Sequence, residues 1–321
     1  MRSWILSAAI LSAPSAGLLQ AADPQLLNLV MPDTKMLAGI NVDQAKTSLF
    51  GQFVIQQLQA QDPHFQEFVA ETGFDPTKDL DEVLVAANGN GKTASHLVLA
   101  RGTFDAGSIG AAAKASGATS ENYHGVTITE NSRHGDGFAF LSGNIAIAGD
   151  IASVKAAIDR QSAPSTLPAS LLVAVNQLSA TEDAWGISEV PLPALKVPSS
   201  TPNLQALPAN TFQNIAQASG GMKFGAQVVL NAQLLADTAQ NATAMANVLQ
   251  FLLNLGEMQL QQNTQAVTAL KSVLVTASGN TVTVSASIPE AQVEALAQMR
   301  HNHAMQPNAR RPKAQGQQQR F

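Results

Sequence analysis

The sequence predicts an α+β protein of two related halves, in which antiparallel strands and hairpins form sheet with helices packed on it. Short apolar runs bounded by turn residues indicate strands, and helical spacing with capping residues indicates helices between them. The outline of the chain also repeats: "LLVAVNQLSATEDAWGISEVPL" resembles the opening "LLNLVMPDTKMLAGINVDQA". Hairpins mixed with helices in this way are typical of the α+β class.

The N-terminus has the features of a secretory signal peptide. Arg2 supplies the positive charge, residues 4–19 are apolar or small, and cleavage is expected after Ala21 or Ala22. No cysteine follows, so lipoprotein processing is excluded. An uncleaved anchor helix is the alternative, but the run is short and holds Pro14. We therefore expect an exported, soluble protein, periplasmic or extracellular.

The expected organisation is a signal peptide (1–22), a first α+β repeat (23–162), a second α+β repeat (163–299) with a Pro-rich loop (191–208), and a disordered basic tail (300–321). In the first repeat we expect strands at 36–43, 83–87, 96–102, 123–131 and 137–150, and helices at 48–61, 62–73, 105–117 and 151–160. In the second we expect a strand at 222–231, a long helix over 232–258, and a strand, turn, strand and helix over 267–299.

The stretch "VLVAANGNGKTASHLVLARG" contains Gly91-Lys92-Thr93, the back half of a phosphate-binding P-loop. Ala86 stands where the first glycine is needed, and a strand follows where a P-loop needs a helix. The similar stretch "VLVTASGNTVTVSASIPEAQVEALAQM" has no lysine. Both stretches predict a β-hairpin, turning at Asn-Gly or Ser-Gly-Asn, followed by an Ala-rich helix. Nucleotide binding is not expected.

Composition excludes further classes of function. The chain has no cysteine, which removes thiol catalysis, iron–sulfur clusters and thiolate zinc sites. The tail holds five of the 18 basic residues and no acid, so 13 basic residues face 23 acidic ones in the remainder, a net charge of −10. Such a body repels nucleic acid. The tail is a solubilising segment or a contact for anionic lipid or polymer.

The histidines are the only candidates for catalysis or metal binding. Ser132, His134 and Asp136 lie together in "NSRHGDG", which fits a polar hairpin tip better than a catalytic relay. His96 and His124 could meet across a sheet and hold a metal with a nearby carboxylate. An envelope hydrolase or metal-dependent enzyme using His96, His124 or His134 is thus the alternative function. We expect no cofactor and no bound metal.

The order of elements resembles that of uncharacterised exported bacterial proteins with paired strand–helix–hairpin–helix repeats, the DUF3352-like type. That resemblance implies no known chemistry. We therefore expect a non-catalytic binding or interaction protein of the cell envelope, with its ligand site between the halves. The candidate ligand-binding residues are Phe53, Trp185 and Phe251. The expected partner is an envelope protein, a polymer, a small apolar ligand or a second copy of the chain.

Overall fold

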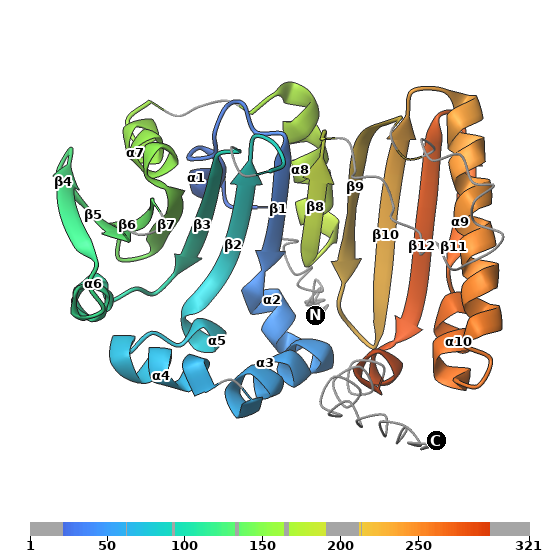
Figure 1. The fold of residues 1–321 in the computed structure, drawn as a ribbon, viewed down its shortest axis with the longest axis horizontal. Helices are drawn as coiled ribbons and strands as arrows, with labels where there is room; N and C mark the ends of the chain where they lie inside the picture. The colour runs from blue at the N-terminus through green and yellow to red at the C-terminus, as the bar shows by residue number, and fades with distance from the viewer. Residues whose placement is uncertain are drawn as a thin grey trace, which may run out of the picture.

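The computed structural model describes residues 22–61, 63–91, 94–131, 135–163, 167–190, 212 and 214–295. Their strands form one antiparallel sheet of 12 strands, in the order β11-β12-β10-β9-β8-β1-β2-β3-β7-β6-β5-β4. Figure 1 shows this sheet running across the whole molecule, with β1 and β8 near its centre and α9 along one end. The expectation of an α+β fold with antiparallel strands and packed helices is confirmed. Residues 1–21 of the predicted signal peptide, the Pro-rich loop and the basic tail lie outside the described residues.

The first half contains the elements α1 (Pro24–Leu27), β1 (Met36–Asn41), α2 (Val42–Thr47), α3 (Leu49–Gln61), α4 (Pro63–Thr72), α5 (Pro76–Asp79), β2 (Leu80–Ala87), β3 (His96–Gly102), α6 (Ala106–Ala115), β4 (Thr119–Tyr123), β5 (Val126–Asn131), β6 (Asp136–Ser142), β7 (Ile145–Asp150) and α7 (Ile151–Arg160). Local signals set several of these limits. Asp105 and Asp150 accept hydrogen bonds from the first backbone N–H groups of α6 and α7. Gly73, at φ +70°, follows the last residue of α4.

The second half contains α8 (Ala169–Thr181), β8 (Ala184–Ser188), β9 (Ile215–Lys223), β10 (Gln227–Ala236), α9 (Ala239–Gln259), α10 (Thr264–Lys271), β11 (Leu274–Ser278) and β12 (Thr281–Pro289). Residues 290–295 are again helical. The halves meet where β1 and β8 pair antiparallel, with Ala38 opposite Gly186.

The strand order shows how the halves correspond. Outward from the centre, the first half runs β1, β2, β3, β7, β6 and the second runs β8, β9, β10, β12, β11. In each half a helix precedes the central strand, a helix follows the third strand, and a helix follows the last hairpin. The first half adds β5 and β4 at its outer edge. The two similar sequence segments, which open each half, therefore form α1–β1 in the first half and α8–β8 in the second.

One sequence-based correspondence is wrong in position. The stretches at Val83 and Val273 are both antiparallel hairpins followed by a helix, as expected. The strand order, however, places β11–β12 opposite β6–β7, and β2–β3 opposite β9–β10. A hairpin followed by a helix occurs twice within the first half, as β2–β3–α6 and as β6–β7–α7. The local residue pattern therefore could not decide which of the two corresponds to β11–β12.

Three expected elements also need correction. The run 222–231 is not one strand, because a turn at Phe224–Ala226 divides it between β9 and β10. Residues 232–236 are not helical: they belong to β10, and α9 begins at Ala239 after the N-cap Thr238. The apolar residues of 232–242 satisfy both the strand and the helix period, and sheet pairing decided between them. Residues 267–271, expected in a strand, belong to α10 (Thr264–Lys271).

The two faces of the sheet carry different helices. We define face A as the face that bears Leu37, Leu84 and Trp185, and face B as the face that bears Ala38 and Val85. The main core lies on face A, where Leu26 of α1, Val154 of α7 and Leu171 of α8 are fully buried with Leu84. In the second half, α9 packs on face B through Met245 and Ala246 against Val282. Helices α1, α7 and α8 therefore pack on face A and α9 packs on face B, so α8 and α9 of the second half lie on opposite faces of the sheet.

Candidate functional site

The centre of face B forms an apolar groove across the junction of the halves. Register places one row of six paired residues along its floor: Val85, Ala38, Gly186, Gly220, Ala232 and Val284. Four of these six have no side chain beyond a methyl group, so the floor is low. The groove has a volume of about 840 Å³. None of its described lining residues carries a charge.

Apolar side chains are exposed at the centre of this sheet, where burial is the rule. Val85 on β2 is 45% exposed and Met36 on β1 is 36% exposed, although both strands are paired on both sides. Their neighbours Leu84 and Leu37 on face A are 0% and 1% exposed. Contiguous exposed apolar surface of this kind marks an interaction or ligand site.

The second half supplies one wall of the groove. Leu234 and Val284 line the groove and also pack against the core beneath α9. Val273, between α10 and β11, joins them. The groove is therefore bounded by a helix-covered region on one side and continues over β1 and β2 on the other.

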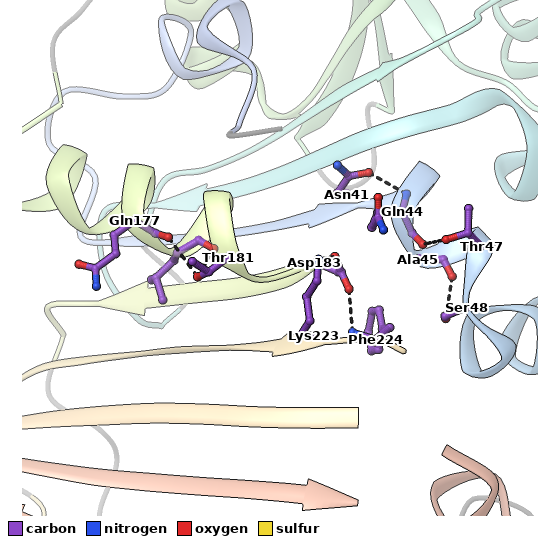
Figure 2. A network of polar contacts seen from close by, with 11 residues as sticks. Asn41, Gln44, Ala45, Thr47, Ser48, Gln177, Thr181, Asp183, Lys223 and Phe224 are labelled. Atoms are coloured by element: carbon purple, nitrogen blue, oxygen red, sulfur yellow. Dashed lines mark hydrogen bonds and ion pairs between the residues drawn. The ribbon is translucent and has the colours of Figure 1, made fainter. Parts of the chain in front are cut away.

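A buried carboxylate fixes the strands at one end of the junction. Asp183, 2% exposed, pairs with Lys223 Nζ at 2.5 Å and accepts a hydrogen bond from the Phe224 backbone N–H at 2.7 Å (Figure 2). Its own backbone N–H donates to the Met222 carbonyl, and its carbonyl accepts from the Asn41 N–H. Asp183 thus ties β1, β8 and β9 together, which sets the register of the groove floor.

A second, more polar cavity of about 510 Å³ adjoins the groove on face B. His96 and Val98 line this cavity and pair with Ala87 and Val85, which line the groove. His96 Nε2 lies 3.6 Å from Asp136 Oδ1, and its Nδ1 lies 3.9 Å from Asp150 Oδ2.

Asp150 beside this cavity is ionised more readily than usual. Burial opposes its ionisation, but the backbone N–H groups of His96 and Ser153 donate to its carboxylate. The net effect holds the Asp150 pKa below its ordinary value. Because Asp150 also caps α7, its charge has a structural role.

The predicted meeting of His96 with His124 is wrong. Strands β7, β6 and β5 lie between β3, which bears His96, and β4, which His124 follows. His124 stacks on Tyr123 and pairs with Asp159, its Nδ1 lying 3.1 Å from Oδ1. Ser132 and His134 lie outside the described residues. Within the described part of the chain, no group of three or more His, Asp or Glu side chains could hold a metal ion.

The structure does not bring Phe53, Trp185 and Phe251 together. Trp185 borders the groove from β8, but it is 6% exposed and its indole packs on face A against Gly39, where a Cβ would lie 2.6 Å from Trp185 Cζ2. Phe53 on α3 stacks with Phe50, which contacts Phe224. Phe251 on α9 is 38% exposed and is not a lining residue of the groove.

Apart from Trp185, the groove residues were missed by sequence reasoning, although a signal was present. "MLAGI" on β1 and "VLVAA" on β2 are apolar at successive positions, which predicts strands that are apolar on both faces. Such a strand needs cover on each face. Helices cover face A, and among the described residues nothing covers Val85 on face B.

Comparison with known proteins adds information on the fold. No family model matches the chain, and no curated protein matches it. Among solved structures, crystal form III of TP0453 matches with a TM-score of 0.52 and 9% identity, over 85% of this chain and 97% of that one. Crystal form I of TP0453 matches with a TM-score of 0.49 and 10% identity, over 87% and 99%. The likeness to crystal form III shows a shared fold.

Within the described residues, no helix is long and apolar enough to cross a membrane.

Proposed function

We propose that this chain is an exported, non-catalytic binding protein of the bacterial cell envelope that holds a small apolar ligand in the groove of face B. The observation that carries the proposal is the uncharged, open groove at the junction of the halves, with Val85 and Met36 exposed at the centre of the sheet. Export rests on the signal-peptide pattern, and membership of the DUF3352-like type rests on the order of elements.

Size and chemistry both favour a small ligand over a protein partner. Volumes of about 300–1,000 Å³ are usual for small-molecule sites, and this groove has about 840 Å³. Its lining supplies apolar contacts with few polar groups, Ser188 among them. This chemistry suits an elongated hydrocarbon-rich molecule.

The enzyme alternative gains no support from the described residues. His96 and His124 are separated by three strands, and His96 is paired with carboxylates rather than with a nucleophile. The hypothesis that the basic tail (300–321) contacts anionic lipid or polymer concerns residues outside the described part of the chain.

The single tryptophan gives a direct test. Trp185 is the only tryptophan beyond Trp4, so a chain without its leader has one fluorescent indole, and it borders the groove. Titration with N-phenyl-1-naphthylamine should quench Trp185 emission and raise the probe's own emission. Ala38→Phe fills the floor and should weaken probe binding at least about 10-fold, which is on the order of 1.4 kcal/mol.

A matched control uses the opposite face. Thr276 on β11 is exposed and lies on face A, so Thr276→Phe adds the same ring outside the groove and should leave probe binding unchanged. Equal affinity in the wild-type chain and in Ala38→Phe would refute the groove as the site. As a separate check of the proposal, native mass spectrometry of the protein from its own host's envelope should show excess mass that leaves on denaturation.

A further inference from the structure

The backbone nitrogen of Asp23 sits between the two oxygens of a partly buried carboxylate. Glu82 on β2 places Oε1 and Oε2 each 3.2 Å from the Asp23 nitrogen. A peptide N–H carries one hydrogen and can point well at only one oxygen. A symmetric approach by both oxygens suits an ammonium group, which has three hydrogens and a full positive charge.

The side chain of Asp23 is held by a second, complementary group. Arg101 on β3 lies beside Glu82, with which it is paired in register, and its Nε is 2.5 Å from Asp23 Oδ2. Arg101 Nη2 also donates to Gln25 Oε1 at 2.8 Å. Asp23 Oδ1 accepts the Gln25 backbone N–H at 2.6 Å, which caps α1. The residue at 23 is therefore fixed at its backbone nitrogen and at its carboxylate.

The charges of this cluster do not balance while residue 23 is joined to residue 22. Glu82 and Asp23 bring two carboxylates, and Arg101 brings one guanidinium. Burial raises the pKa of Glu82 to about 7, and the neighbouring Asp23 carboxylate adds to the rise, although the Asp23 N–H and Arg101 oppose it. One further positive charge at the Asp23 nitrogen would make the cluster neutral.

The sequence offers a source for that charge. Residues 1–22 have the pattern of a cleavable leader, and cleavage after Ala22 makes Asp23 the first residue. Hydrolysis of the Ala22–Asp23 bond consumes one water: its oxygen completes the Ala22 carboxylate, and the Asp23 nitrogen leaves as an amine that is protonated near neutral pH.

We propose that the leader is cleaved between Ala22 and Asp23, and that Glu82 and Arg101 form a built receptor for the new N-terminus. Glu82 binds the α-ammonium group, and Arg101 binds the side-chain carboxylate of the same residue. These contacts join α1 to β2 and β3 on face A, and processing adds the positive charge that completes the pairing with Glu82. This proposal is independent of the groove, which lies on face B.

The first test is the mass of the chain recovered from the host's envelope fraction. We expect a chain that begins at Asp23. A chain that begins at Ala22, or one that keeps the leader, would overturn the proposal.

The second test titrates the α-amino group itself. Selective ¹³C and ¹⁵N labelling of aspartate in the chain that begins at Asp23 gives the first residue an NMR signal that follows its α-amino group and leaves its three hydrogens in place. We expect its pKa to lie about one unit above the ordinary range of about 7.7–8.0, and Glu82→Gln to remove that rise. Glu121→Gln is the matched control, because Glu121 lies on β4 and pairs with Lys155 of α7, elsewhere in the same half. An amine that titrates within the ordinary range in the wild-type chain would overturn the proposal.

A third measurement covers the case in which Glu82→Gln fails to fold. The chain that begins at Asp23 is compared with the same chain extended back to Ala21, which adds the buried side chain of Ala22 and removes the charge at the Asp23 nitrogen. Because burial of Ala22 does not depend on pH, the readout is the fall in unfolding temperature from pH 7 to pH 10, where the amine is neutral. We expect a larger fall for the Asp23 chain, and an equal fall in the two chains would count against the receptor.

Discussion

Two uncovered regions of the sheet differ sharply in chemistry. The outer strands of the second half expose mostly polar residues on face A, such as Thr276 and Ser287, with Leu274 as an apolar exception. The central strands expose Val85, Met36 and Ala38 on face B. Hydrophobic burial explains the first region, since a face without helices is expected to be polar. It leaves the second unexplained unless another molecule covers it, and this contrast supports the proposed groove.

The largest expected effect is a difference in stability between variants at two adjacent residues of β2. Leu84→Ala removes a side chain that is fully buried on face A and should lower the free energy of unfolding by about 2–5 kcal/mol. Val85→Ala removes an exposed side chain on face B and should cost less than about 1 kcal/mol. Urea unfolding of both variants measures the difference. Similar costs would mean that Val85 is buried in the folded protein and that the groove is not open.

The next test compares two glycines that face each other on the groove floor. A Cβ at Gly220 would lie 2.4 Å from the Asn231 backbone oxygen, so Gly220→Ala should destabilise the fold by about 1–3 kcal/mol. A Cβ at Gly186 would meet Ala38 Cβ at 3.6 Å, an ordinary contact. Gly186→Ala should therefore stabilise the chain by a few tenths to about 1 kcal/mol, while it lowers probe affinity.

Thermal unfolding and probe titration of the two variants check this pair. If Gly186→Ala left probe binding unchanged, the floor at the junction would not contact the ligand. A stable Gly220→Ala variant would show that β9 and β10 can separate locally.

A smaller effect concerns pH and face A. In a chain that keeps the peptide bond to Ala22, burial raises the pKa of Glu82 to about 7 from an ordinary value of 4.5. The folded state then binds a proton that the unfolded state has released. The contribution of Glu82 to stability is therefore complete below pH 4.5 and is lost as the pH rises through 7. We expect a loss of about 1 kcal/mol, because the group is partly exposed and solvent screens it.

Chemical unfolding at pH 4.5 and 7 measures this loss, with Glu82→Gln as the reference in which it is absent. The chain that begins at Asp23 should not show the loss, because the α-ammonium group favours the charged carboxylate. An identical pH dependence in wild type and Glu82→Gln would contradict the assignment to Glu82.

Much of the fold followed from local signals in the sequence. Asp105 and Asp150 begin helices, Gly73 ends one, and Gly279 turns the β11–β12 hairpin, because each imposes a backbone conformation on its immediate neighbours. The strand at 96–102 was predicted at its observed limits for the same reason. The β2–β3 hairpin closes through the longer loop of residues 88–95 instead of a tight turn at Asn90-Gly91. The division of 222–236 between two strands was not predicted. The turn at 224–226 was included in one strand, and the apolar spacing of 232–236 fits a helix as well as a strand.

The sequence by itself determined the fold class, most helices and hairpins, the absence of cysteine chemistry, and the relatedness of the halves. Only the tertiary structure decided that the halves join into one sheet through β1 and β8, that α8 and α9 of the second half cover opposite faces, and that an apolar groove remains at the junction. The physical reason is the range of the forces involved. Turns and caps depend on a few neighbouring residues, whereas cover for Val85, or a partner for the nitrogen of Asp23, depends on residues far away in the chain.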